Sequence, residues 1–253
     1  MHKLFKHTLF VGKKAFFLPS CHSTNEEAAK LIMRREQANG QVIYTDFQSK
    51  GRGQRGNSWE SEEGANILIS VVLDTHFIEA TDFFHLNILT SLAIHDVLNE
   101  YIKMDVKIKW PNDLMFENKK IAGILIENYL KQSVIEWCIV GVGLNINQLK
   151  FNEPGAVSLA QICGQTFDRE ELIGLLLQKV EGRYLQLQRG AFTKLKDEYH
   201  ESLYWKGQIH VFQDTANRFF NGKILGVESS GKLRLALEDG EQAFDFKEIR
   251  FIK

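Results

Sequence analysis

The spacing of apolar and polar residues predicts helices packed on a sheet whose strands are mostly antiparallel. Apolar side chains cover most faces of Asp82–Tyr101, which is typical of a largely buried helix. Two segments rich in β-forming residues precede it, at Gln41–Phe47 and Asn66–Leu73. Short polar turns, which favour antiparallel pairing, join three more: Val106–Trp110, Lys120–Glu127 and Val134–Val142. We therefore expect an α/β (α+β) fold with helices on a mixed, largely antiparallel sheet.

Capping patterns predict where two further helices begin. Two overlapping capping-box spacings within Ser23–Glu27 indicate a helix that runs toward Arg35. Asp168 with Glu171 has the same spacing and predicts a helix that continues through Leu187. A shorter helix is expected from about 191 to 203.

The pattern changes after Trp205, where short alternating segments are separated by turns that contain Gly or Asn. These segments are Gln208–Gln213, Gly222–Val227, Lys232–Leu237 and Ala243–Phe246. Their spacing suggests a small closed barrel or sandwich of about 50 residues. We therefore place a domain boundary near Tyr204, between a domain at 1–204 and a smaller one at 205–253.

Composition and charge exclude several classes of protein. The chain has 253 residues, is 44% hydrophobic and 25% charged, and carries a net charge of −1. This balance argues against a protein whose main partner is a polyanion such as DNA or RNA. Three cysteines without metal-like spacing fit a reducing compartment, and no apolar run reaches the roughly 20 residues that span a bilayer. We expect a cytoplasmic protein with no membrane segment.

The segment Lys50–Gly56 carries three positive charges and three glycines. One interpretation is a solvated, flexible connector; the other is a loop that becomes ordered around an anion. Gly51, Gly53 and Gly56 match the dinucleotide fingerprint, but a strand rather than a helix is predicted next, so we reject it. Gly226–Lys232 imitates a phosphate-binding loop, yet it lies between two predicted short strands and is interpreted as a hairpin turn.

Two further clusters place polar side chains at the ends of strands. In Lys109–Asp113 the proline ends the strand, so that Asn112 and Asp113 fall at a strand-to-turn junction. In Gly141–Asn145 the glycines permit close backbone approach, and Asn145 is the first polar side chain after an apolar run. Alone, each cluster is more often a turn than a site.

In this order, the clusters resemble the biotin protein ligases, which are biotin–[acetyl-CoA-carboxylase] ligases. The matching segments are Ser23–Asn25, Gln48, Gly51–Gly56 with Trp59, Lys109–Asp113, Lys120 with Ala122–Leu125, and Gly141–Asn145. The resemblance covers almost the whole chain. It implies a class II synthetase-like catalytic domain followed by a small C-terminal SH3-like β-barrel.

The resemblance also implies the reaction. Ligases of this family activate the biotin carboxylate with ATP to give biotinyl-5′-AMP and pyrophosphate. They then transfer biotin to one lysine of the biotin carboxyl carrier domain of a biotin-dependent carboxylase. Because two anions must meet in the first step, cations are needed there, and Arg52 and Lys120 match the family's catalytic positions. Asp113 is a candidate ligand for Mg2+, which carboxylates and phosphates share.

The remaining site residues follow from the same resemblance. Positions that match the family's biotin contacts are Ser23, Thr24, Asn25, Gln48, Gly51, Arg52, Gly53, Gln54, Lys120 and Gly123. Positions that match its nucleotide contacts are Arg55, Trp59, Asn112 and Asn145, with Trp59 in the place of the aromatic that covers the adenine. Helix capping is the competing explanation for Ser23 and Thr24.

Two departures from the family pattern alter the expectations. Where well-known bacterial members carry a second loop arginine, this chain has Gln54, which removes one charge near the mixed anhydride. Only about 20 residues precede Ser23, too few for a winged helix-turn-helix, so we expect a monofunctional ligase that does not bind DNA, as a monomer or homodimer. The alternatives are a lipoate–protein ligase, which shares the adenylate chemistry, and an RNA-binding module built on the Arg-Gly loop.

Overall fold

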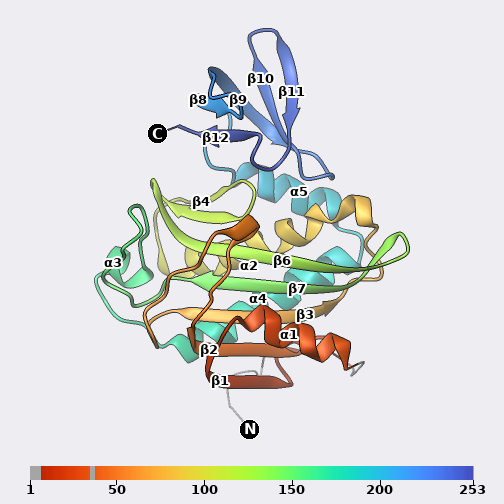
Figure 1. Cartoon of the computed structure of the whole chain (residues 1–253), viewed down its shortest axis with the longest axis vertical. Coiled ribbons are helices and arrows are strands. Elements are labelled where there is room, and N and C mark those ends of the chain that lie inside the picture. The colour runs from red at the N-terminus through yellow and green to blue at the C-terminus, as the bar shows by residue number, and fades with distance from the viewer. Residues whose placement is uncertain (1–6, 35–37, 253) are drawn as a thin grey trace.

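A computed structural model describes residues 7–34 and 38–252, and its centre is a seven-stranded sheet (Figure 1). The strand order is β1-β2-β3-β7-β6-β5-β4, with β1 parallel to β2 and every other neighbouring pair antiparallel. The strands are β1 (Ala15–Cys21), β2 (Val42–Gln48), β3 (Ile67–Asp74), β4 (Val106–Lys109), β5 (Asp113–Phe116), β6 (Lys119–Lys131) and β7 (Val134–Leu144). The predicted mixed, largely antiparallel sheet is confirmed.

The sequence patterns missed two strands of this sheet. In β1 an edge position leaves Phe16 and Phe17 about two-fifths exposed, so the alternation that marks a half-buried strand is absent. In β5 only four residues follow Pro111 and Asn112, and the turn signal obscured them. Elsewhere the predicted strand bounds differ from the observed ones by a few residues.

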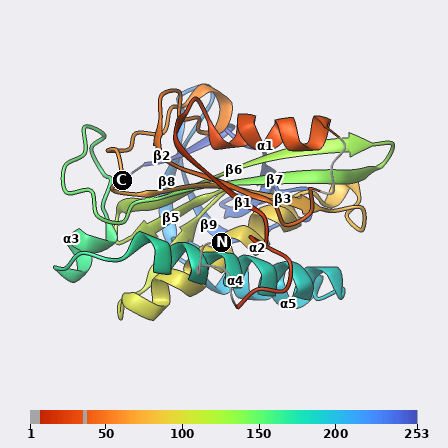
Figure 2. The ribbon, with the colours of Figure 1, turned by 90° about the horizontal axis from the view of Figure 1, so that it is seen from below.

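Helices cover the two faces of the sheet unequally (Figure 2). On one face lie α2 (Phe84–Tyr101), α4 (Arg169–Gln188) and α5 (Phe192–Glu201). The other face carries α1 (Thr24–Met33), while the short α3 (Leu159–Cys163) lies near one end of the sheet. The predicted helices are confirmed, and the Asp168 carboxylate caps α4 by accepting from the backbone N–H groups of Glu170 and Glu171. No helix among the described residues is long and apolar enough to cross a membrane.

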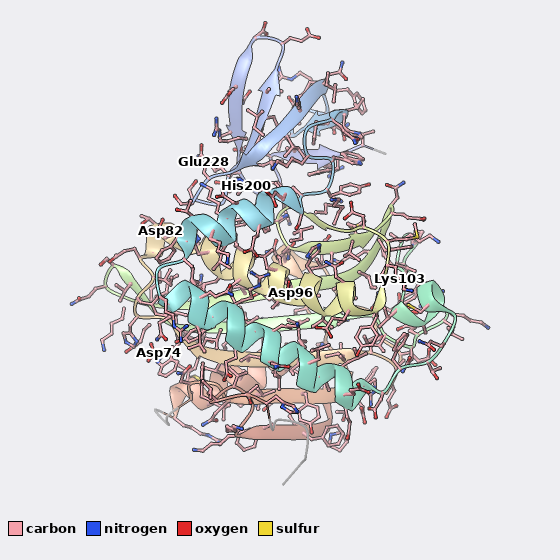
Figure 3. All side chains as sticks on the ribbon, turned by 180° about the vertical axis from the view of Figure 1, so that it is seen from behind. Asp74, Asp82, Asp96, Lys103, His200 and Glu228 are labelled. Atoms are coloured by element: carbon pink, nitrogen blue, oxygen red, sulfur yellow. The ribbon has the colours of Figure 1, made fainter. Side chains whose placement is uncertain are left out.

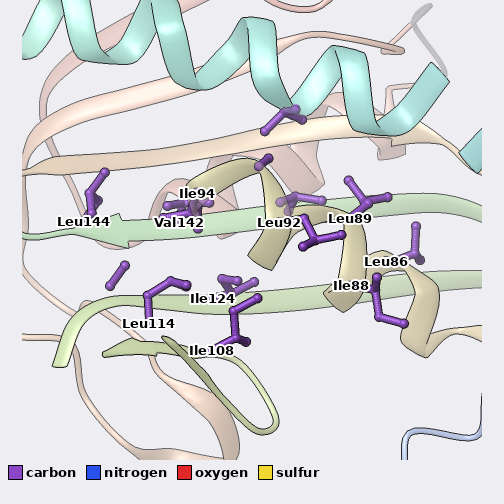
Figure 4. Close-up of a cluster of buried hydrophobic side chains, with 14 of the residues drawn as sticks. Leu86, Ile88, Leu89, Leu92, Ile94, Ile108, Leu114, Ile124, Val142 and Leu144 are labelled. Carbon is purple, nitrogen blue, oxygen red and sulfur yellow. The ribbon is translucent and has the colours of Figure 1, made fainter. Parts of the chain in front are cut away.

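The main hydrophobic core lies between the sheet and the α2, α4 and α5 face. In β3 the alternate residues Ile67, Ile69, Val71 and Leu73 belong to it, and α2 is buried along most of its length. Figure 4 shows leucine and isoleucine side chains of α2 against Ile124 and Val142 of the sheet. Burial of this continuous apolar layer is the dominant stabilising contribution to the fold.

Two partly buried ion pairs, which share one arginine, join the three helices of this layer. The Arg183 guanidinium of α4 contacts the Asp96 carboxylate of α2 at 2.8 Å and also pairs with Glu198 of α5. Figure 3 shows the three helices side by side, with Asp96 at their junction. Because the arginine side chain is only 13% exposed, both carboxylates are needed to compensate its lost hydration.

A five-stranded antiparallel sheet follows α5, in the order β11-β10-β9-β8-β12. Its strands are β8 (Ile209–Asp214), β9 (Phe219–Val227), β10 (Leu233–Leu237), β11 (Gly240–Phe244) and β12 (Ile249–Phe251). The turn at 228–232 confirms the hairpin interpretation of that segment. The expected small C-terminal β-sheet domain is therefore present, but no hydrogen-bonded pair joins β11 to β12 within the described residues, so closure of the sheet into a barrel is not shown.

The small sheet packs on the larger unit through aromatic residues. Trp110 Nε1 donates to the Gly231 carbonyl oxygen at 2.8 Å, and its ring lies 5.2 Å from that of Phe246. His200 at the end of α5 accepts from the Val227 backbone N–H at 2.9 Å, near the labelled Glu228 in Figure 3. The predicted boundary near Tyr204 falls in the connection between α5 and β8.

Candidate active site

The sheet face opposite the main core carries a floor of small residues. Ser70 pairs with Gly141 across β3 and β7, and Gly143 pairs with Gly123 across β7 and β6. Because side chains alternate along a strand, these positions share one face while their neighbours enter the core. A cavity opens over this floor. It is lined by Ser23, Thr24, Asn25, Gln48, Arg52, Gly53, Gln54, Trp59, Asn112, Lys120, Gly123, Ile124, Leu125, Gly141, Val142 and Gly143.

Helix α1 begins at the edge of this cavity, but not with the predicted capping box. Ser23 is the N-cap residue, yet its hydroxyl makes no capping hydrogen bond among the described residues. Instead the Gln48 Oε1 atom accepts from the Thr24 backbone N–H at 2.7 Å and lies 3.1 Å from the Thr24 hydroxyl. A side chain from β2 therefore caps the helix, while Ser23 lines the cavity.

A buried hydrogen-bond chain connects α1 to the floor. The Ser70 hydroxyl lies 2.6 Å from Asn25 Oδ1 and 2.7 Å from Thr24 Oγ1. Asn25 Nδ2 donates to the Glu127 carboxylate at 2.7 Å and lies 3.3 Å from the Leu125 carbonyl oxygen. A β-carbon on Gly141 would lie 2.3 Å from Asn25 Oδ1, so only glycine lets the asparagine lie this close to β7. The close backbone approach predicted for this glycine is confirmed.

Each hydroxyl of this hydrogen-bond chain has a single proton, and this limit decides which atoms remain as donors or acceptors toward the cavity. Asn25 Oδ1 only accepts, so the single Ser70 proton is directed to it. The Thr24 proton is then directed to Ser70 or to Gln48 Oε1, and the lone pairs of Thr24 remain for a ligand. Because Gln48 Oε1 is occupied at the helix start, its amide nitrogen is the end that remains to donate. Together with the Ser23 hydroxyl, these groups complement a cyclic urea, which has N–H donors and a carbonyl acceptor.

The Lys50–Trp59 segment folds back on itself beside the cavity. Arg52 bridges to Ser58, the Trp59 N–H donates to the Gly51 carbonyl oxygen at 3.0 Å, and a 3-10 turn spans Gln54–Gly56. A strand follows the turn, which confirms rejection of the dinucleotide fingerprint. A β-carbon on Gly51 would lie 2.6 Å from the Trp59 carbonyl oxygen, so this position also requires glycine.

The charged loop residues occupy different environments. The Arg52 guanidinium lies 3.2 Å from the Glu127 carboxylate and 3.8 Å from Glu26, and its side chain is 40% exposed. It lines the first cavity, whereas Gly51 lines a neighbouring surface hollow. The side chain of Arg55, a predicted nucleotide contact, lies outside the described residues.

The Trp59 ring lies on the glycine floor. A β-carbon on Gly143 would lie 2.4 Å from Trp59 Cε2, and one on Gly123 would lie 2.8 Å from Trp59 Cζ3. Lys120 Nζ lies 5.4 Å from the ring centroid, and Trp59 Nε1 is buried without a partner among the described residues. With the ring in this position the first cavity measures only about 50 Å³, well below the several hundred Å³ of typical ligand pockets.

A second cavity of about 620 Å³ lies on the far side of Trp59 and Lys120, which line both cavities. Lys120 Nζ contacts Asp113 Oδ1 at 2.6 Å there, with the lysine side chain 37% exposed. Asn145 also lines it: its Nδ2 donates to the Val157 carbonyl oxygen, while its buried Oδ1 has no partner among the described residues. Lys120 therefore lies between the two cavities, where its charge can neutralise an anion bound in either one.

Asn112 lines the first cavity with Trp59 and does not line the second cavity, where Asn145 lies. The Asn112 side chain is 8% exposed and donates to the Ile124 carbonyl oxygen. The Ile124 N–H donates back to the Asn112 carbonyl oxygen at 3.1 Å. These two hydrogen bonds fix the turn before Asp113 against β6.

The donor set around Asp113 is compatible with magnesium only if a ligand supplies phosphate oxygens. No group of three or more His, Cys, Asp or Glu side chains among the described residues could hold a metal ion. Asp113 lines the second cavity beside Lys120, and the glutamates Glu60 and Glu153 also line that cavity. Mg2+ commonly binds through one or two carboxylates together with substrate phosphates and water, so Asp113 together with the phosphates of a bound nucleotide fits that mode.

Two residues of the site were absent from the sequence predictions. Ser70 is fully buried and is the only polar residue within an otherwise apolar stretch of β3, which is the signal that could have identified it. Glu127 follows the matched segment Ala122–Leu125 by two positions, so that strand alternation places it on the cavity face. Both act through hydrogen bonds to other side chains, which no local spacing rule reveals.

Known proteins resemble the chain in both sequence and structure. The Biotin–[acetyl-CoA-carboxylase] ligase of Paracoccus denitrificans is 28% identical over 90% of this chain and 97% of its own length. The Bifunctional ligase/repressor BirA of Bacillus subtilis is 29% identical over 86% of this chain and 68% of its own. The biotin protein ligase from Aquifex aeolicus in complex with biotin and ATP superimposes with a TM-score of 0.78 and 25% identity, covering 95% of this chain and 100% of that one.

The match at the level of the family includes the strands and loops that build the first cavity and part of the second. The Biotin/lipoate A/B protein ligase family matches residues 17–145, which contain all the predicted site residues. Because that match covers slightly more than half of the chain, the protein belongs to the Biotin/lipoate A/B protein ligase family.

Proposed function

We propose that the protein is an ATP-dependent biotin protein ligase, which forms biotinyl-5′-AMP from biotin and ATP. The observation that carries this proposal is the set of polar groups at Ser23, Thr24 and Gln48 that complement a urea. These groups line the first cavity, and the Lys120–Asp113 ion pair lies at the neighbouring second cavity. Solved relatives were crystallised with biotin and ATP and with biotinylated ATP. Lipoate has no urea and would leave these polar groups without partners, which disfavours the lipoate alternative.

The chain's own residues supply binding and charge neutralisation. Thr24 accepts from a ureido N–H, while Gln48 and Ser23 donate to the ureido carbonyl oxygen. Lys120 lies where the biotin carboxylate and the α-phosphate meet, and its charge offsets the repulsion between the two anions. Arg52 at the cavity wall adds a guanidinium that binds two oxygens at once. No protein nucleophile is needed, because the biotin carboxylate itself attacks phosphorus and pyrophosphate leaves.

On the nucleotide side, Asn145 and Trp59 face the larger cavity, where we place ATP. Asp113 would hold Mg2+ together with the triphosphate, and the ion would neutralise phosphate charge. For biotin to enter, the Trp59 ring must leave Gly123 and Gly143, since the present cavity of about 50 Å³ is too small. The displaced indole then covers the adenine, where stacking contributes about 1–3 kcal/mol.

The acyl acceptor is a lysine of a biotin carboxyl carrier domain. Curated relatives of this chain are named biotin–[acetyl-CoA-carboxylase] ligases, which supports a carrier of that class. In the transfer step the lysine amine attacks the mixed anhydride, an amide bond forms, and AMP leaves with the electron pair of the broken bond. Gln54 in place of a loop arginine leaves one charge fewer near the intermediate.

One set of titrations tests the proposal. The purified chain is titrated calorimetrically with biotin, lipoate and single-stranded RNA, and biotin-dependent ATP–pyrophosphate exchange is measured without carrier. We expect biotin alone to bind and to start exchange, and we expect tryptophan fluorescence to change on binding in the native chain but not in Trp59→Phe. Exchange with lipoate but not biotin would overturn the proposal, as would binding of RNA alone.

A further inference from the structure

The Glu127 carboxylate lies behind the residues that line the first cavity. It is at one end of the hydrogen-bond chain that leads through Asn25 and Ser70 to Thr24. Glu127 lies on the cavity face of β6, its side chain is 32% exposed, and it contacts Asn25 and Arg52 rather than the cavity over the floor. We propose that Glu127 is a positioning residue that makes Thr24 a hydrogen-bond acceptor toward a ureido N–H. This inference rests on the proposed function.

The Asn25 amide is held in one orientation by its hydrogen-bond partners. Its nitrogen end faces two acceptors, the Glu127 carboxylate at 2.7 Å and the Leu125 carbonyl oxygen at 3.3 Å. A flipped amide would place its oxygen against both of them, which is repulsive. Because the shorter of the two contacts is to a charged group, Glu127 supplies the stronger part of this preference. Asn25 Oδ1 is therefore held toward Ser70.

The orientation of the Asn25 amide decides which atom accepts the proton of the Ser70 hydroxyl. Ser70 has one proton and gives it to Asn25 Oδ1, so it has none for Thr24. If Asn25 flipped, its nitrogen would face Ser70, and the Ser70 proton would turn to Thr24 Oγ1 at 2.7 Å. Thr24 would then lose acceptor capacity toward the ligand. The carboxylate thus acts on ligand recognition through two intervening side chains.

Glu127 also pairs with Arg52, so a variant must separate the two roles. Glu127→Ala removes both the acceptor for Asn25 and the charge opposite Arg52. Glu127→Gln removes the charge but keeps an oxygen that accepts from Asn25. Ser70→Ala leaves Glu127 and Arg52 intact and breaks the chain between Asn25 and Thr24.

The test measures dissociation constants by calorimetry, without ATP, for biotin and for biotin methylated on both ureido nitrogens. Glu127→Ala should weaken biotin binding roughly 10-fold and remove most of the preference for biotin over the methylated form. Ser70→Ala should keep that preference, because the proton that would turn to Thr24 is absent. Glu127→Gln should stay within about 3-fold of the native chain. The double variant Glu127→Ala/Ser70→Ala should recover most of the preference that Glu127→Ala loses, because the effect of Glu127 on Thr24 passes through Ser70. Glu238→Ala, an exposed glutamate in the β10–β11 hairpin, is the control.

The outcomes separate the two proposals. If the native chain binds no biotin, the proposed function fails and this inference fails with it. If the native chain binds biotin and Glu127→Ala keeps both affinity and preference, only the positioning role is overturned. Glu127→Gln as weak as Glu127→Ala would assign the effect to Arg52 instead, and a double variant that lacks the preference as fully as Glu127→Ala would contradict transmission through Ser70. Thermal unfolding of each variant identifies losses caused by misfolding.

Discussion

The two faces of the seven-stranded sheet are built from the same strands but serve different ends. Toward α2, α4 and α5 the strands present isoleucine, valine and leucine, and nearly every side chain is buried among apolar neighbours. Toward α1 and the Lys50–Trp59 segment, β3, β6 and β7 present Ser70, Gly123, Gly141 and Gly143. Alternation along a strand lets adjacent residues belong to different faces.

The difference teaches where stability and recognition reside in this molecule. Apolar burial on the helical face is non-directional and scales with area. The opposite face has less apolar surface to bury. Its glycines let Asn25 and Trp59 lie close to the backbone, and its serine orients a hydrogen-bond chain. Substitutions on the first face should therefore change the free energy of unfolding, and substitutions on the second should change ligand binding.

The largest expected effect is on the site face, at the cation between the two cavities. Lys120→Ala should lower biotin-dependent ATP–pyrophosphate exchange about 100- to 1,000-fold, because two anions then approach without the charge that offsets their repulsion. The matched control is Lys119→Ala, whose exposed side chain precedes it in β6. Exchange within a few-fold of the native rate would remove Lys120 from the catalytic role.

On the helical face, Leu92→Ala should lower the free energy of unfolding by about 2–5 kcal/mol, the usual cost of a cavity in a packed core. Leu92 is 1% exposed, whereas the control Leu130→Ala changes a side chain that is 62% exposed. Urea unfolding gives the stability, and calorimetry gives the biotin affinity of the folded variant. A large loss of biotin affinity in folded Leu92→Ala would break the proposed separation of the faces.

Gly141→Ala tests the glycine floor directly. The new methyl group would lie 2.3 Å from Asn25 Oδ1, so the asparagine must move and the chain to Thr24 is broken. We expect biotin to bind about 10-fold more weakly, in line with the loss of one or two buried hydrogen bonds. Gly182→Ala in α4 is the control, since no described atom lies within 4 Å of its added carbon. That change should stabilise the chain by about 0.5–1 kcal/mol.

Sequence patterns predicted the helical face better than the site face. Periodicity located α2 and most strands because burial of apolar residues is the cause of that periodicity. It missed β1, whose exposed Phe16 and Phe17 do not alternate, and it left open whether the small C-terminal sheet closes into a barrel or forms a sandwich. Closure depends on strand tilt and register, which no short segment encodes.

For the site, motifs brought together most of the correct neighbours but not their connections. Thr24, Gln48 and Lys120, which the resemblance assigns to biotin binding, line one cavity. Ser70 and Glu127 were missed, because their partners lie 45 to 102 residues away in the sequence. The helix-capping alternative for Ser23 was wrong in detail, since Gln48 performs the capping from another strand.

Gln54→Arg sharpens the comparison within the site. Gln54 lines the first cavity at the start of the 3-10 turn, where an arginine would add a charge-assisted hydrogen bond to the intermediate. We expect release of biotinyl-5′-AMP into solution to slow roughly 10-fold. Release is followed after single-turnover formation of labelled intermediate, with Gln132→Arg on the exposed β6–β7 turn as the control. An unchanged release rate would mean that position 54 does not contact the phosphate.

The smallest expected effect is a pH dependence of stability that arises away from the site face. Burial lowers the pKa of His85 and His95 on α2, of His200 on α5 and of His210 on β8. A histidine whose pKa is lower in the folded than in the unfolded state binds fewer protons when folded, so stability falls as the pH drops below about 6.5, the ordinary histidine value. His76 opposes this trend, because its hydrogen bond to Asp74 raises its pKa, and its contribution is lost as the pH rises.

Urea unfolding at pH 7.5 and 5.5 measures the net effect, and we expect lower stability at pH 5.5. His76→Gln should steepen the fall by removing the opposing group. His200→Gln should reduce it, since Nε2 of the neutral ring accepts from the Val227 N–H and protonation destroys that acceptor. The described residues that line the first cavity include no histidine, so biotin affinity should be equal at the two pH values. A parallel loss of biotin affinity at pH 5.5 would show that the faces are coupled through the shared strands.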